Sequence, residues 1–497
     1  RNLYPFNTKL KELNKLNEIL FGLNYNIVGN DTIEINELKI DSKSIQPNDV
    51  FIAIKGTSVD GHTFIDTVIQ KGAKVIVCEQ LPNNINDSIT YIQVEDTRKI
   101  AALLACNFYH HPSKKTELVG VTGTNGKTTI ATLLYQLYRK AGFNVGLIST
   151  IENKINEKII SATHTTPNPI ALNQLLDMMV QQNCDYVFME VSSHAAHQDR
   201  IAGLNFAGAI FSNISHDHLD YHKTFDEYIK AKKIFFDQLP SSAFALVNID
   251  DKRGEVMLQN TLAKRYTYAL KSLADFNFKI LENNLSGLVL KYKHQDIYTH
   301  QVGNFNAYNL LAILATAILL GMDEQKALGR ISELQSAEGR FDIVKSNRNN
   351  IVGIVDYAHT PDALKNVIDT INTVRTGNES LITIIGCGGN RDKAKRPEMA
   401  LIAATLSTKV ILTSDNPRDE EPEQIIAEMQ AGIPPHLTKK VVTILDRKEA
   451  IKTGVLLAQA NDVILLAGKG HEKYQEVKGI KHPFDDKQIL SGILNNI

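Results

Sequence analysis

Residues 117–129 read ELVGVTGTNGKTT, and this stretch carries the strongest structural signal in the chain. The segment ELVGV has the character of a buried strand, and it leads through a glycine turn into a helical pattern that starts at Lys127. Glycines in such a turn let backbone N–H groups close around phosphate oxygens, and the lysine neutralises charge on the β- and γ-phosphates. The stretch therefore predicts a phosphate loop for ATP or GTP. The predicted contacts are Gly123, Thr124, Asn125, Gly126, Lys127, Thr128 and Thr129.

The loop departs in one position from the pattern GxxxxGK[ST], because residue 121 is valine rather than glycine. The alternative interpretation is a glycine-rich turn that binds nothing. Lys-Thr-Thr at a helix start, directly after a buried strand, is difficult to explain by packing and favours the phosphate loop. The loop does not indicate how the γ-phosphate is used.

Outward from the loop, the chain alternates apolar strands with helices, which is typical of a parallel α/β sheet. Residues 184–191 and 206–214 are predicted strands, and residues 127–142 a helix. Short alternating segments within residues 278–302 predict an antiparallel patch, followed by helices over 304–321 and 323–335.

The α/β pattern restarts after Gly339, where it predicts a doubly wound domain whose ligand edge lies at the strand ends. Before the phosphate loop, strands and helices precede a linker at residues 110–115. We therefore predict an α/β protein of three domains, with a central parallel sheet of the P-loop ATPase type and a Rossmann-like C-terminal domain. The boundaries are 1–112, 113–338 and 339–497. The predicted C-terminal strands are 350–357, 380–387, 409–415, 440–445 and 462–468.

Composition argues against a nucleic-acid-binding, a membrane-spanning and a secreted protein. The 497 residues carry a formal net charge of -1, which argues against a nucleic acid or an acidic membrane held by bulk charge. No apolar run approaches the roughly 20 residues of a membrane span, and the first 20 residues lack a signal-peptide core. The four cysteines are far apart. We expect a cytoplasmic protein with reduced thiols.

A second polar cluster follows two of the predicted central strands. Glu190 ends one strand, and residues 216–222 (HDHLDYH) follow the next. Carboxylates and imidazoles beside a phosphate loop suit Mg²⁺ or Mn²⁺. Each histidine taken alone is better explained as a solvated loop residue. Two such clusters in a sheet that already has a phosphate loop favour a functional site.

At this point several long motifs together resemble the Mur ligases, the ATP-dependent amide-forming ligases of peptidoglycan precursor synthesis. They are GVTGTNGKTT (120–129), MEVSSH (189–194), DHLDYH (217–222), GNFNAYNLLAILA (303–315) and DYAHTPDAL (356–364). Further motifs are similar to those of the UDP-N-acetylmuramoyl-tripeptide synthetases, the MurE type, within that family. They are residues 41–65, GCGGNRDKAKRPEM (386–399), SDNPR (414–418) and GKGHE (468–472). The resemblance extends from about residue 41 to residue 472.

The resemblance implies a UDP-binding N-terminal domain, a central ATP-binding domain and a C-terminal domain that binds an amino acid. It implies that ATP phosphorylates the D-Glu γ-carboxylate of UDP-N-acetylmuramoyl-L-alanyl-D-glutamate, and that an amine then displaces phosphate. The implied catalytic residues are Lys127, Lys232, Glu190 and His218. The implied Mg²⁺ ligands are Thr128, Glu190, His218 and Lys232 as a carbamate. Without the resemblance, Lys232 would be read as an ordinary exposed helix lysine.

Further contacts carry over from the family motifs, and a monomer is expected. For the UDP-muramoyl-dipeptide they are Ser42, Lys43, Thr165, Thr166, Ser192, Gln198 and Arg200. For ATP, beyond the loop, they are Asn304, Asn309, Arg340, Asp356 and His359. On chemistry alone, the threonine pair is equally well explained as a polar turn.

The amino-acid substrate depends on Arg418. Family members that add meso-diaminopimelate carry the motif DNPR, whereas lysine-adding members replace the arginine. A guanidinium matches the extra carboxylate of diaminopimelate with two parallel hydrogen bonds. Such bonds contribute roughly 1.5–3 kcal/mol, or about tenfold to a hundredfold in affinity. The predicted diaminopimelate contacts are Arg391, Asp415, Asn416, Pro417, Arg418, Gly468 and Glu472.

Three alternatives remain open from the sequence. The first is the L-lysine-adding ligase of the same family, against which Arg418 argues. The second is a folylpolyglutamate synthetase, which shares the ligase core but lacks the N-terminal UDP domain. The third is a P-loop ATPase that couples hydrolysis to the motion of a partner, and it would not need both ligase substrates for turnover.

Overall fold

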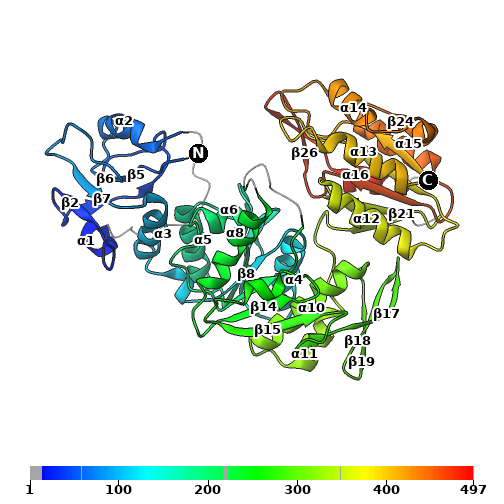
Figure 1. The fold of residues 1–497 in the computed structure, drawn as a ribbon, viewed down its shortest axis with the longest axis horizontal. Coiled ribbons are helices and arrows are strands. Elements are labelled where there is room, and N and C mark those ends of the chain that lie inside the picture. The colour runs from blue at the N-terminus through cyan, green and yellow to red at the C-terminus, as the bar shows by residue number, and fades with distance from the viewer. Residues whose placement is uncertain (1–13, 57–58, 216–221, 223, 347–348, 496–497) are drawn as a thin grey trace.

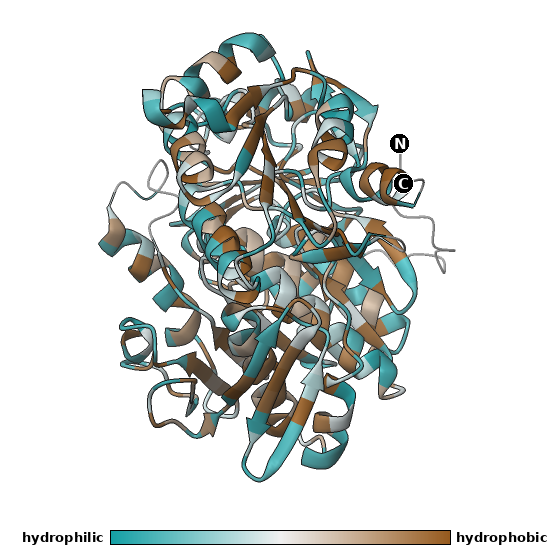
Figure 2. Cartoon of the chain, turned by 90° about the vertical axis from the view of Figure 1, so that its right-hand side faces the viewer, coloured by the Kyte–Doolittle hydropathy of each residue, from teal (hydrophilic) through white to brown (hydrophobic). Residues whose placement is uncertain are grey.

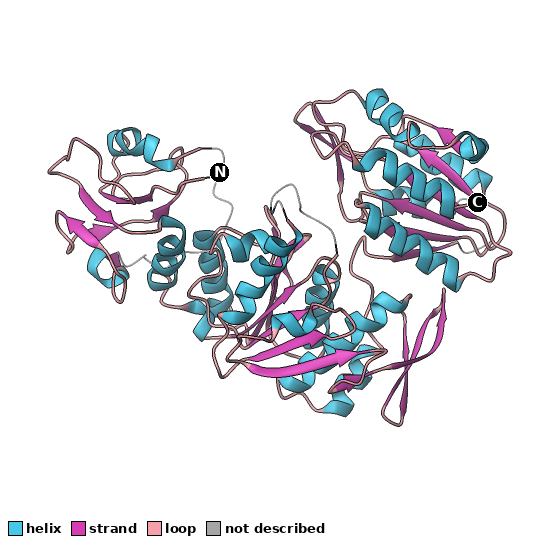
Figure 3. Cartoon of the chain, viewed as in Figure 1, coloured by secondary structure: helices cyan, strands magenta, loops and turns pink. Residues whose placement is uncertain are grey.

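The computed structural model describes residues 14–56, 59–215, 222, 224–346 and 349–495. These residues form three groups of α/β structure in chain order, and the middle group lies between the other two (Figure 1). Helices flank the strands in each group (Figure 3). Among the described residues, no helix is long and apolar enough to cross a membrane.

The first group is built on a five-stranded sheet in the order β2-β7-β6-β5-β4. β4 to β7 are parallel, and β2 is antiparallel at the edge. The strands are β2 (Asn26–Val28), β4 (Leu38–Lys39), β5 (Val50–Ile52), β6 (Val75–Cys78) and β7 (Thr90–Gln93). A small pair, β1 (Asn14–Lys15) and β3 (Glu34–Ile35), lies beside it. The helices are α1 (Leu16–Ile19), η1 (Gly61–Phe64), α2 (Ile65–Gln70) and α3 (Thr97–Phe108).

The predicted linker at residues 110–115 is a compact turn. It contains the short helix η2 (Pro112–Lys114), and His110 and His111 adopt positive φ angles of 55° and 50°. Ser113 is buried, and its hydroxyl accepts a hydrogen bond from Asn205 N at 3.0 Å. The turn is therefore packed against the central group.

The central group contains the predicted parallel sheet, with β8 (Glu117–Thr122) in its middle. The order is β11-β10-β9-β12-β8-β13-β14-β15-β16, and β10 and β11 are antiparallel at one edge. Its buried strands are near-continuous apolar runs, as expected when helices cover both faces (Figure 2). The other strands are β9 (Val145–Ile148), β10 (Glu152–Ile155), β11 (Lys158–Ser161), β12 (Tyr186–Glu190), β13 (Gly208–Phe211), β14 (Phe244–Asn248), β15 (Lys264–Ala269) and β16 (Phe276–Asn277).

Two apolar cores lie on the two faces of this sheet. On one face, β8 packs against α4 (Lys127–Lys140) and α10 (Asn304–Leu319), and on the other it packs with α5 (Pro169–Gln181) and α8 (Phe225–Asp237). The parallel register brings the ends of β8, β12 and β13 to one edge. The remaining helices are α6 (Ser193–His197), α9 (Gly254–Met257) and α11 (Glu324–Ile331).

The antiparallel patch predicted within residues 278–302 is confirmed. It is a three-stranded sheet of β17 (Lys279–Asn284), β18 (Gly287–Tyr292) and β19 (Gln295–Thr299). α10 follows it and is buried along most of its length.

The C-terminal group is the predicted doubly wound sheet, in the order β20-β21-β25-β22-β23-β24. Five of its strands are parallel and match the predicted segments, while β20 is an antiparallel edge that the sequence did not predict. The strands are β20 (Asp342–Lys345), β21 (Val352–Asp356), β22 (Leu381–Ile385), β23 (Lys409–Leu412), β24 (Val441–Thr443) and β25 (Val463–Ala467).

Helices cover both faces of this sheet as well. α12 (Pro361–Val374), α13 (Lys395–Leu406) and α14 (Pro422–Gln430) share one core, and α15 (Arg447–Leu457) and α16 (Asp486–Leu494) share the other. Pro422 occupies the first turn of α14, as its position after three acidic residues predicts. A hairpin of β26 (Tyr474–Val477) and β27 (Ile480–Pro483) was not predicted, and η3 (Pro435–Lys440) precedes β24.

A buried ion pair joins the first residues of α15 and α16. Arg447 Nε and Nη2 donate to the two carboxylate oxygens of Asp486 at 2.8 and 2.6 Å, and both side chains are fully buried. Arg447 Nη2 also donates to the carbonyl of Ala467 at the end of β25, at 3.1 Å. The pair thus ties the C-terminal helix to the central strand of the sheet.

We expect Asp486→Ala to destabilise the C-terminal domain by about 3–5 kcal/mol, because it leaves a buried guanidinium without its counter-charge. The measurement is the free energy of unfolding in urea, followed by circular dichroism. Asp485→Ala is the control, since Asp485 is the side-chain cap on Gln488 N and its loss should cost about 1 kcal/mol. Equal losses from both variants would contradict a structural role for the ion pair.

Candidate active site

A cavity of about 560 Å³ lies between the edge of the central sheet and the C-terminal group. The phosphate loop, the ends of β12 and β13, and the segment after β21 line it. The predicted site residues on its wall are Thr124, Asn125, Gly126, Lys127, Thr128, Thr129, Thr165, Glu190, Ser192, Lys232, Asn309, Arg340, Asp356 and His359. Residues that the sequence assigned separately are therefore brought together in one space.

Both backbone conformation and close packing require glycine at two positions of the loop. Gly123 and Gly126 have φ angles of 151° and 90°, which side chains rarely adopt. A Cβ at Gly123 would come within 1.9 Å of Ser212 Oγ, and one at Gly126 within 2.7 Å of Asn309 Oδ1. The loop is therefore held tightly against the end of β13 and against α10.

Two lysines converge on one carbonyl of this loop. Lys127 Nζ donates to the carbonyls of Gly123 and Thr124, each at 2.9 Å. Lys232 Nζ, from α8, also donates to Gly123 O at 2.9 Å and lies 4.5 Å from the ring centroid of Tyr228. Lys232 is 1% exposed, so the alternative of an ordinary exposed helix lysine is wrong. Its amine lies at the loop rather than in solvent.

Glu190 is fully buried at the end of β12. Its Oε1 accepts a hydrogen bond from Thr150 N at 2.7 Å, and its Oε2 accepts one from Thr150 Oγ1 at 3.2 Å. Thr150 Oγ1 lies 3.0 Å from Thr165 Oγ1. The Thr166 hydroxyl donates to the carbonyl of Glu190 at 2.8 Å and accepts from Ser192 N at 3.1 Å. Thr150, backed by Thr165, thus braces the carboxylate on the cavity wall, and Thr166 holds the backbone of Glu190.

The donors present fit a Mg²⁺ ion that is shared with a nucleotide. Within the described part of the chain, no three His, Cys, Asp or Glu side chains come together as a metal site. Mg²⁺ is usually held by one or two carboxylates together with substrate phosphates and water. The Glu190 carboxylate and the Thr128 hydroxyl, both on the cavity wall, supply such a partial set. His218, the other predicted imidazole ligand, lies outside the described residues.

The remaining predicted dipeptide contacts form a second group next to Glu190. Arg200 Nη1 donates to Thr166 O at 2.9 Å, and its Nε and Nη2 donate to Gln198 Oε1 at 3.1 and 2.7 Å. The Ser192 hydroxyl accepts from Ala195 N and caps α6. Ser42 and Lys43 lie elsewhere, after β4 in the first group. There Ser42 O accepts from Lys71 Nζ at 2.7 Å, and Lys43 N donates to Asp41 Oδ1 at 2.9 Å.

Arg340 connects the C-terminal group to the phosphate loop. Its Nη2 donates to Thr128 Oγ1 at 3.2 Å, and its guanidinium lies 4.7 Å from the ring centroid of Tyr357. Asp356 accepts backbone hydrogen bonds from Phe341 and Ala358, each at 2.7 Å, and burial raises the pKa of its carboxyl, against the neighbouring Arg340.

Residues 468–472 pack against Tyr357 and Gly339, next to Arg340. A Cβ at Gly470 would come within 2.6 Å of Tyr357 Cβ and 2.8 Å of Gly339 O. The rings of His471 and Tyr357 are 4.9 Å apart, and burial lowers the pKa of His471 to about 3.

The two predicted asparagines of α10 differ in their surroundings. Asn309 lies on the cavity wall, and its amide donates to Asn306 Oδ1 at 3.0 Å. Asn304, at the first turn of α10, is exposed and accepts from Asn283 Nδ2 at 3.2 Å. Asn304 does not line the cavity.

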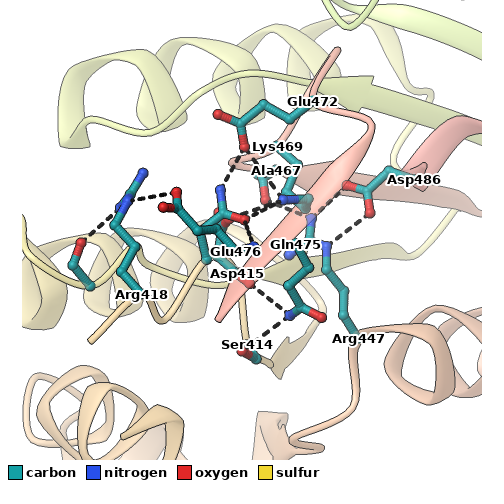
Figure 4. A network of polar contacts seen from close by, with 12 residues as sticks. Ser414, Asp415, Arg418, Arg447, Ala467, Lys469, Glu472, Gln475, Glu476 and Asp486 are labelled. Carbon is teal, nitrogen blue, oxygen red and sulfur yellow. Dashed lines mark hydrogen bonds and ion pairs between the residues drawn. The ribbon is translucent and has the colours of Figure 1, made fainter. Parts of the chain in front are cut away.

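Most of the predicted amino-acid contacts form a polar cluster at the ends of β23 and β25 (Figure 4). Asn416 Nδ2 donates to Glu472 Oε2 at 2.8 Å. Lys469 Nζ lies within 3.5 Å of oxygens of Asp415, Asn416 and Glu472. A Cβ on Gly468 would come within 2.8 Å of Asp415 Oδ2, which explains glycine there.

Arg418 is fixed beside this cluster in a left-handed conformation, with φ of 52°. Its backbone N–H donates to Glu476 O at 3.0 Å, and Lys478 N donates to Arg418 O at 2.7 Å. Its Nη1 donates to Gly389 O at 2.7 Å, and its Nε lies 3.4 Å from Glu476 Oε2. The unpredicted hairpin β26–β27 thus holds the backbone and orients the guanidinium.

Three further predicted features surround Arg418. Glu420 pairs with Arg396 at 2.9 Å rather than with Arg418, as expected if the acids behind Arg418 do not bind substrate. Arg391 is exposed, and both it and Arg418 lie near Gly388. The carbonyl of Pro417 would come within 1.9 Å of a Cβ on Gly389.

Sequence reasoning missed several residues of these sites. Lys469 stands inside the quoted motif GKGHE but was not assigned a role. Tyr308 and Asp250 lie on the cavity wall, where Tyr308 OH donates to Asp250 Oδ2 at 2.8 Å. Burial raises the pKa of Asp250, but hydrogen bonds from Ser272, Tyr308 and the backbone outweigh it and bring the pKa to about 2. No local pattern marks Tyr308 or Asp250, because the two residues are 58 positions apart in sequence.

Comparison with known proteins gives three matching family models that together span most of the chain. The Mur ligase family, catalytic domain, matches residues 34–109. The Mur ligase middle domain matches residues 121–317. The Mur ligase, glutamate ligase domain, matches residues 339–470.

Individual relatives agree with these models. A protein of Cytophaga hutchinsonii named UDP-N-acetylmuramoyl-L-alanyl-D-glutamate–2,6-diaminopimelate ligase is 55% identical over 472 residues, covering 95% of this chain and 97% of its own. A protein of Phocaeicola vulgatus with the same name is 54% identical over 483 residues, covering 97% and 100%. A solved structure of an enzyme of that name has a TM-score of 0.70 and 31% identity, covering 97% of this chain and 99% of its own.

Proposed function

Because the chain belongs to the Mur ligase family, we propose that it adds meso-2,6-diaminopimelate to UDP-N-acetylmuramoyl-L-alanyl-D-glutamate in an ATP-dependent step of peptidoglycan synthesis. The observation that carries this proposal is the 55% identity, over nearly the whole chain, to a relative named for that reaction. The match over residues 34–109 argues against a folylpolyglutamate synthetase, for which no N-terminal UDP domain is expected.

The geometry supports an acyl-phosphate mechanism. An amine does not displace oxygen from a carboxylate, so the D-Glu γ-carboxylate must first receive the γ-phosphoryl group of ATP. The loop amides and Lys127 would hold the nucleotide phosphates, and the Lys127 ammonium offsets the negative charge that accumulates in the transition state. Arg340, from the C-terminal group, contacts Thr128 of the phosphate loop. This contact would couple nucleotide binding to closure of the two domains.

Glu190, Thr128, His218 and a carbamate on Lys232 are the proposed ligands of Mg²⁺. When bound, the ion would neutralise phosphate charge and polarise the transferring phosphoryl group. The buried Lys232 lies beside the loop, where a carbamate would turn a cation into an anion. Thr150 and Thr165 keep the Glu190 carboxylate oriented toward the cavity.

In the second step the amine of the amino acid attacks the acyl phosphate, an amide bond forms, and phosphate leaves. Asp415, Asn416, Glu472 and Arg418 would hold the amino acid, with Glu472 on an ammonium group and Arg418 on the distal carboxylate. Within the described residues, the contacts of Arg418 engage Nη1 and Nε, which leaves Nη2 for a ligand. Thr165, Thr166, Gln198 and Arg200 would hold the muramoyl dipeptide, and Ser42 and Lys43 the uridine diphosphate.

We further propose the domain division 1–112, 113–338 and 339–497, since each range contains one of the three large sheets. We place the reaction in the cytoplasm, where ATP is available, and expect the enzyme to act as a monomer.

The function is tested by an amino-acid competition assay with purified protein, ATP, Mg²⁺ and the UDP-dipeptide. Phosphate release should require both the UDP-dipeptide and diaminopimelate, and an equimolar mixture with L-lysine should give the diaminopimelate product. Preferential use of lysine would favour the lysine-adding alternative. Phosphate release without either co-substrate would favour a mechanical ATPase.

Replacement of Arg418 should affect one substrate selectively. We expect Arg418→Asn to raise the KM for diaminopimelate by about tenfold to a hundredfold, because the charged hydrogen bond from Nη2 to the distal carboxylate is lost. Asparagine is chosen because it tolerates the left-handed backbone at this position. The measurement is steady-state kinetics with each substrate varied in turn.

The control for this prediction is Arg330→Asn, at a partly exposed arginine on α11 that pairs with Glu333. It should leave all three KM values unchanged. An equal rise in the KM values for ATP and diaminopimelate in Arg418→Asn would show that Arg418 has only a structural role.

A further inference from the structure

Lys469 is a fully buried cation at the centre of the amino-acid cluster, two residues beyond β25. Its Nζ lies 3.0 Å from Asn416 Oδ1, 3.4 Å from Glu472 Oε2 and 3.5 Å from Asp415 Oδ1. A lysine ammonium has three N–H donors, and these three acceptors match them in number. Figure 4 shows the side chain reaching into the middle of the network. Lys469 can therefore act on a ligand only through its neighbours.

The first neighbour that Lys469 controls is Asn416. Asn416 Oδ1 accepts from Lys469 Nζ and also from Glu476 N at 2.9 Å. These two donors fix the orientation of the amide, so that its NH₂ group is turned to Glu472 Oε2 at 2.8 Å. Without the ammonium, one of the two bonds that set this orientation is lost.

The second neighbour is Glu472. Burial and the nearby Asp415 carboxylate raise the pKa of Glu472, whereas Lys469 and Asn416 lower it. Arg447 is engaged with Asp486, so Asp415 and Glu472 share the Lys469 ammonium as their direct cationic partner. Two carboxylates on one ammonium leave one negative charge in excess. This excess complements the ammonium group of an incoming amino acid.

The groups that face Glu472 come from several elements. The titratable and charged groups are Asp415 after β23, Lys469 after β25, Tyr357 after β21 and Arg447 on α15. The ring of Tyr474 of β26 also lies near Lys469, with its centroid 5.7 Å from Nζ. Among the residues described here, Lys469 is the cation in direct contact with Glu472.

We propose that Lys469 is a positioning residue of the amino-acid site: its ammonium orients the Asn416 amide and holds the Glu472 carboxylate in place, so that the cluster binds the substrate ammonium. This inference rests on the proposed function, since it assigns a role within the same site. The three N–H donors of Lys469 are directed at protein acceptors, not at the amino acid or the nucleotide. Its removal should therefore affect one substrate through two neighbouring side chains.

The test is Lys469→Met, which keeps the length of the side chain and removes its charge. We expect the KM for diaminopimelate to rise by about tenfold to a hundredfold, and the KM values for ATP and the UDP-dipeptide to stay unchanged. The pH profile of kcat/KM for diaminopimelate should also move. Without Lys469 the pKa of Glu472 rises, so Glu472 becomes neutral at a higher pH and the acid limb shifts upward.

Lys452→Met, at an exposed lysine on α15, is the matched control and should change neither KM nor the pH profile. Glu472→Gln and the double variant Lys469→Met/Glu472→Gln separate direct from indirect action. If Lys469 acts through Glu472, adding Lys469→Met to Glu472→Gln produces no further shift of the acid limb. The double variant also removes a buried charge together with its counter-charge, so it keeps the test available if Lys469→Met alone does not fold.

The outcomes distinguish this inference from the proposed function. If the unaltered enzyme does not use diaminopimelate, the proposed function fails. If it does, and Lys469→Met changes neither the diaminopimelate KM nor the acid limb, only the role of Lys469 is overturned. A parallel loss for all three substrates together with a lower melting temperature would reduce Lys469 to a purely structural residue.

Discussion

Lys127→Ala is expected to reduce kcat by about a hundredfold to a thousandfold, the range found when one electrostatic group that stabilises a transition state is removed. Lys127 begins α4 and its Nζ lies at the carbonyls of Gly123 and Thr124, within the loop that would enclose the nucleotide phosphates. Alanine leaves the helix intact but removes the only charge that the loop itself carries. The measurement is the ATP- and diaminopimelate-dependent release of phosphate.

Lys140→Ala is the matched control for this variant. Lys140 is in the last turn of the same helix and forms a long, partly exposed ion pair with Glu333 at 3.7 Å. Its loss should leave turnover and melting temperature unchanged, since such pairs contribute little. Unchanged turnover in Lys127→Ala would overturn the assignment of the phosphate loop.

Lys232→Ala is expected to have an effect of similar size, about a hundredfold or more in kcat. Lys232 is buried, and its amine meets the same carbonyl as Lys127, so the two like charges oppose each other beside the nucleotide site. A carbamate at this position would make the pair attractive. A short carboxylate such as acetate should therefore restore part of the activity by entering the space that alanine leaves.

Lys230→Ala tests whether the effect is specific. Lys230 lies on the same helix but is exposed, and its loss should change neither the activity nor the response to acetate. Normal activity of Lys232→Ala without additives would exclude the carbamate. Low activity that acetate does not restore would indicate that Lys232 acts as a cation on the loop.

Strong local signals made much of the fold predictable. The strand–glycine–helix sequence around Lys127 predicted β8 and α4 because both elements have long, continuous patterns. The parallel strands of the C-terminal sheet were equally predictable, because each is a largely apolar run. By contrast, β26 and β27 have four residues each, and one ends in Pro483, so neither shows a clear alternation. Yet this hairpin is what orients Arg418.

Sequence motifs named many residues that line one cavity, but they did not predict how these residues are arranged there. A charged residue on a helix is ordinarily exposed, so nothing in the local pattern predicts that Lys232 is buried. The contact of Arg340 with Thr128 joins residues 212 positions apart and depends on how two domains pack. The role of Lys469 depends in the same way on three partners, two of which follow a different strand.

Residues 468–472 form a wall between the proposed amino-acid and nucleotide sites. Lys469 and Glu472 belong to the amino-acid cluster, whereas Gly470 and His471 pack on Tyr357, on which Arg340 rests. A ligand that braces this backbone from one side makes it easier for a second ligand to bind on the other, and such coupling is reciprocal. For inhibitor design, a compound that fills the amino-acid pocket should bind best to the nucleotide-loaded enzyme. Two compounds directed at opposite sides of the wall should act synergistically.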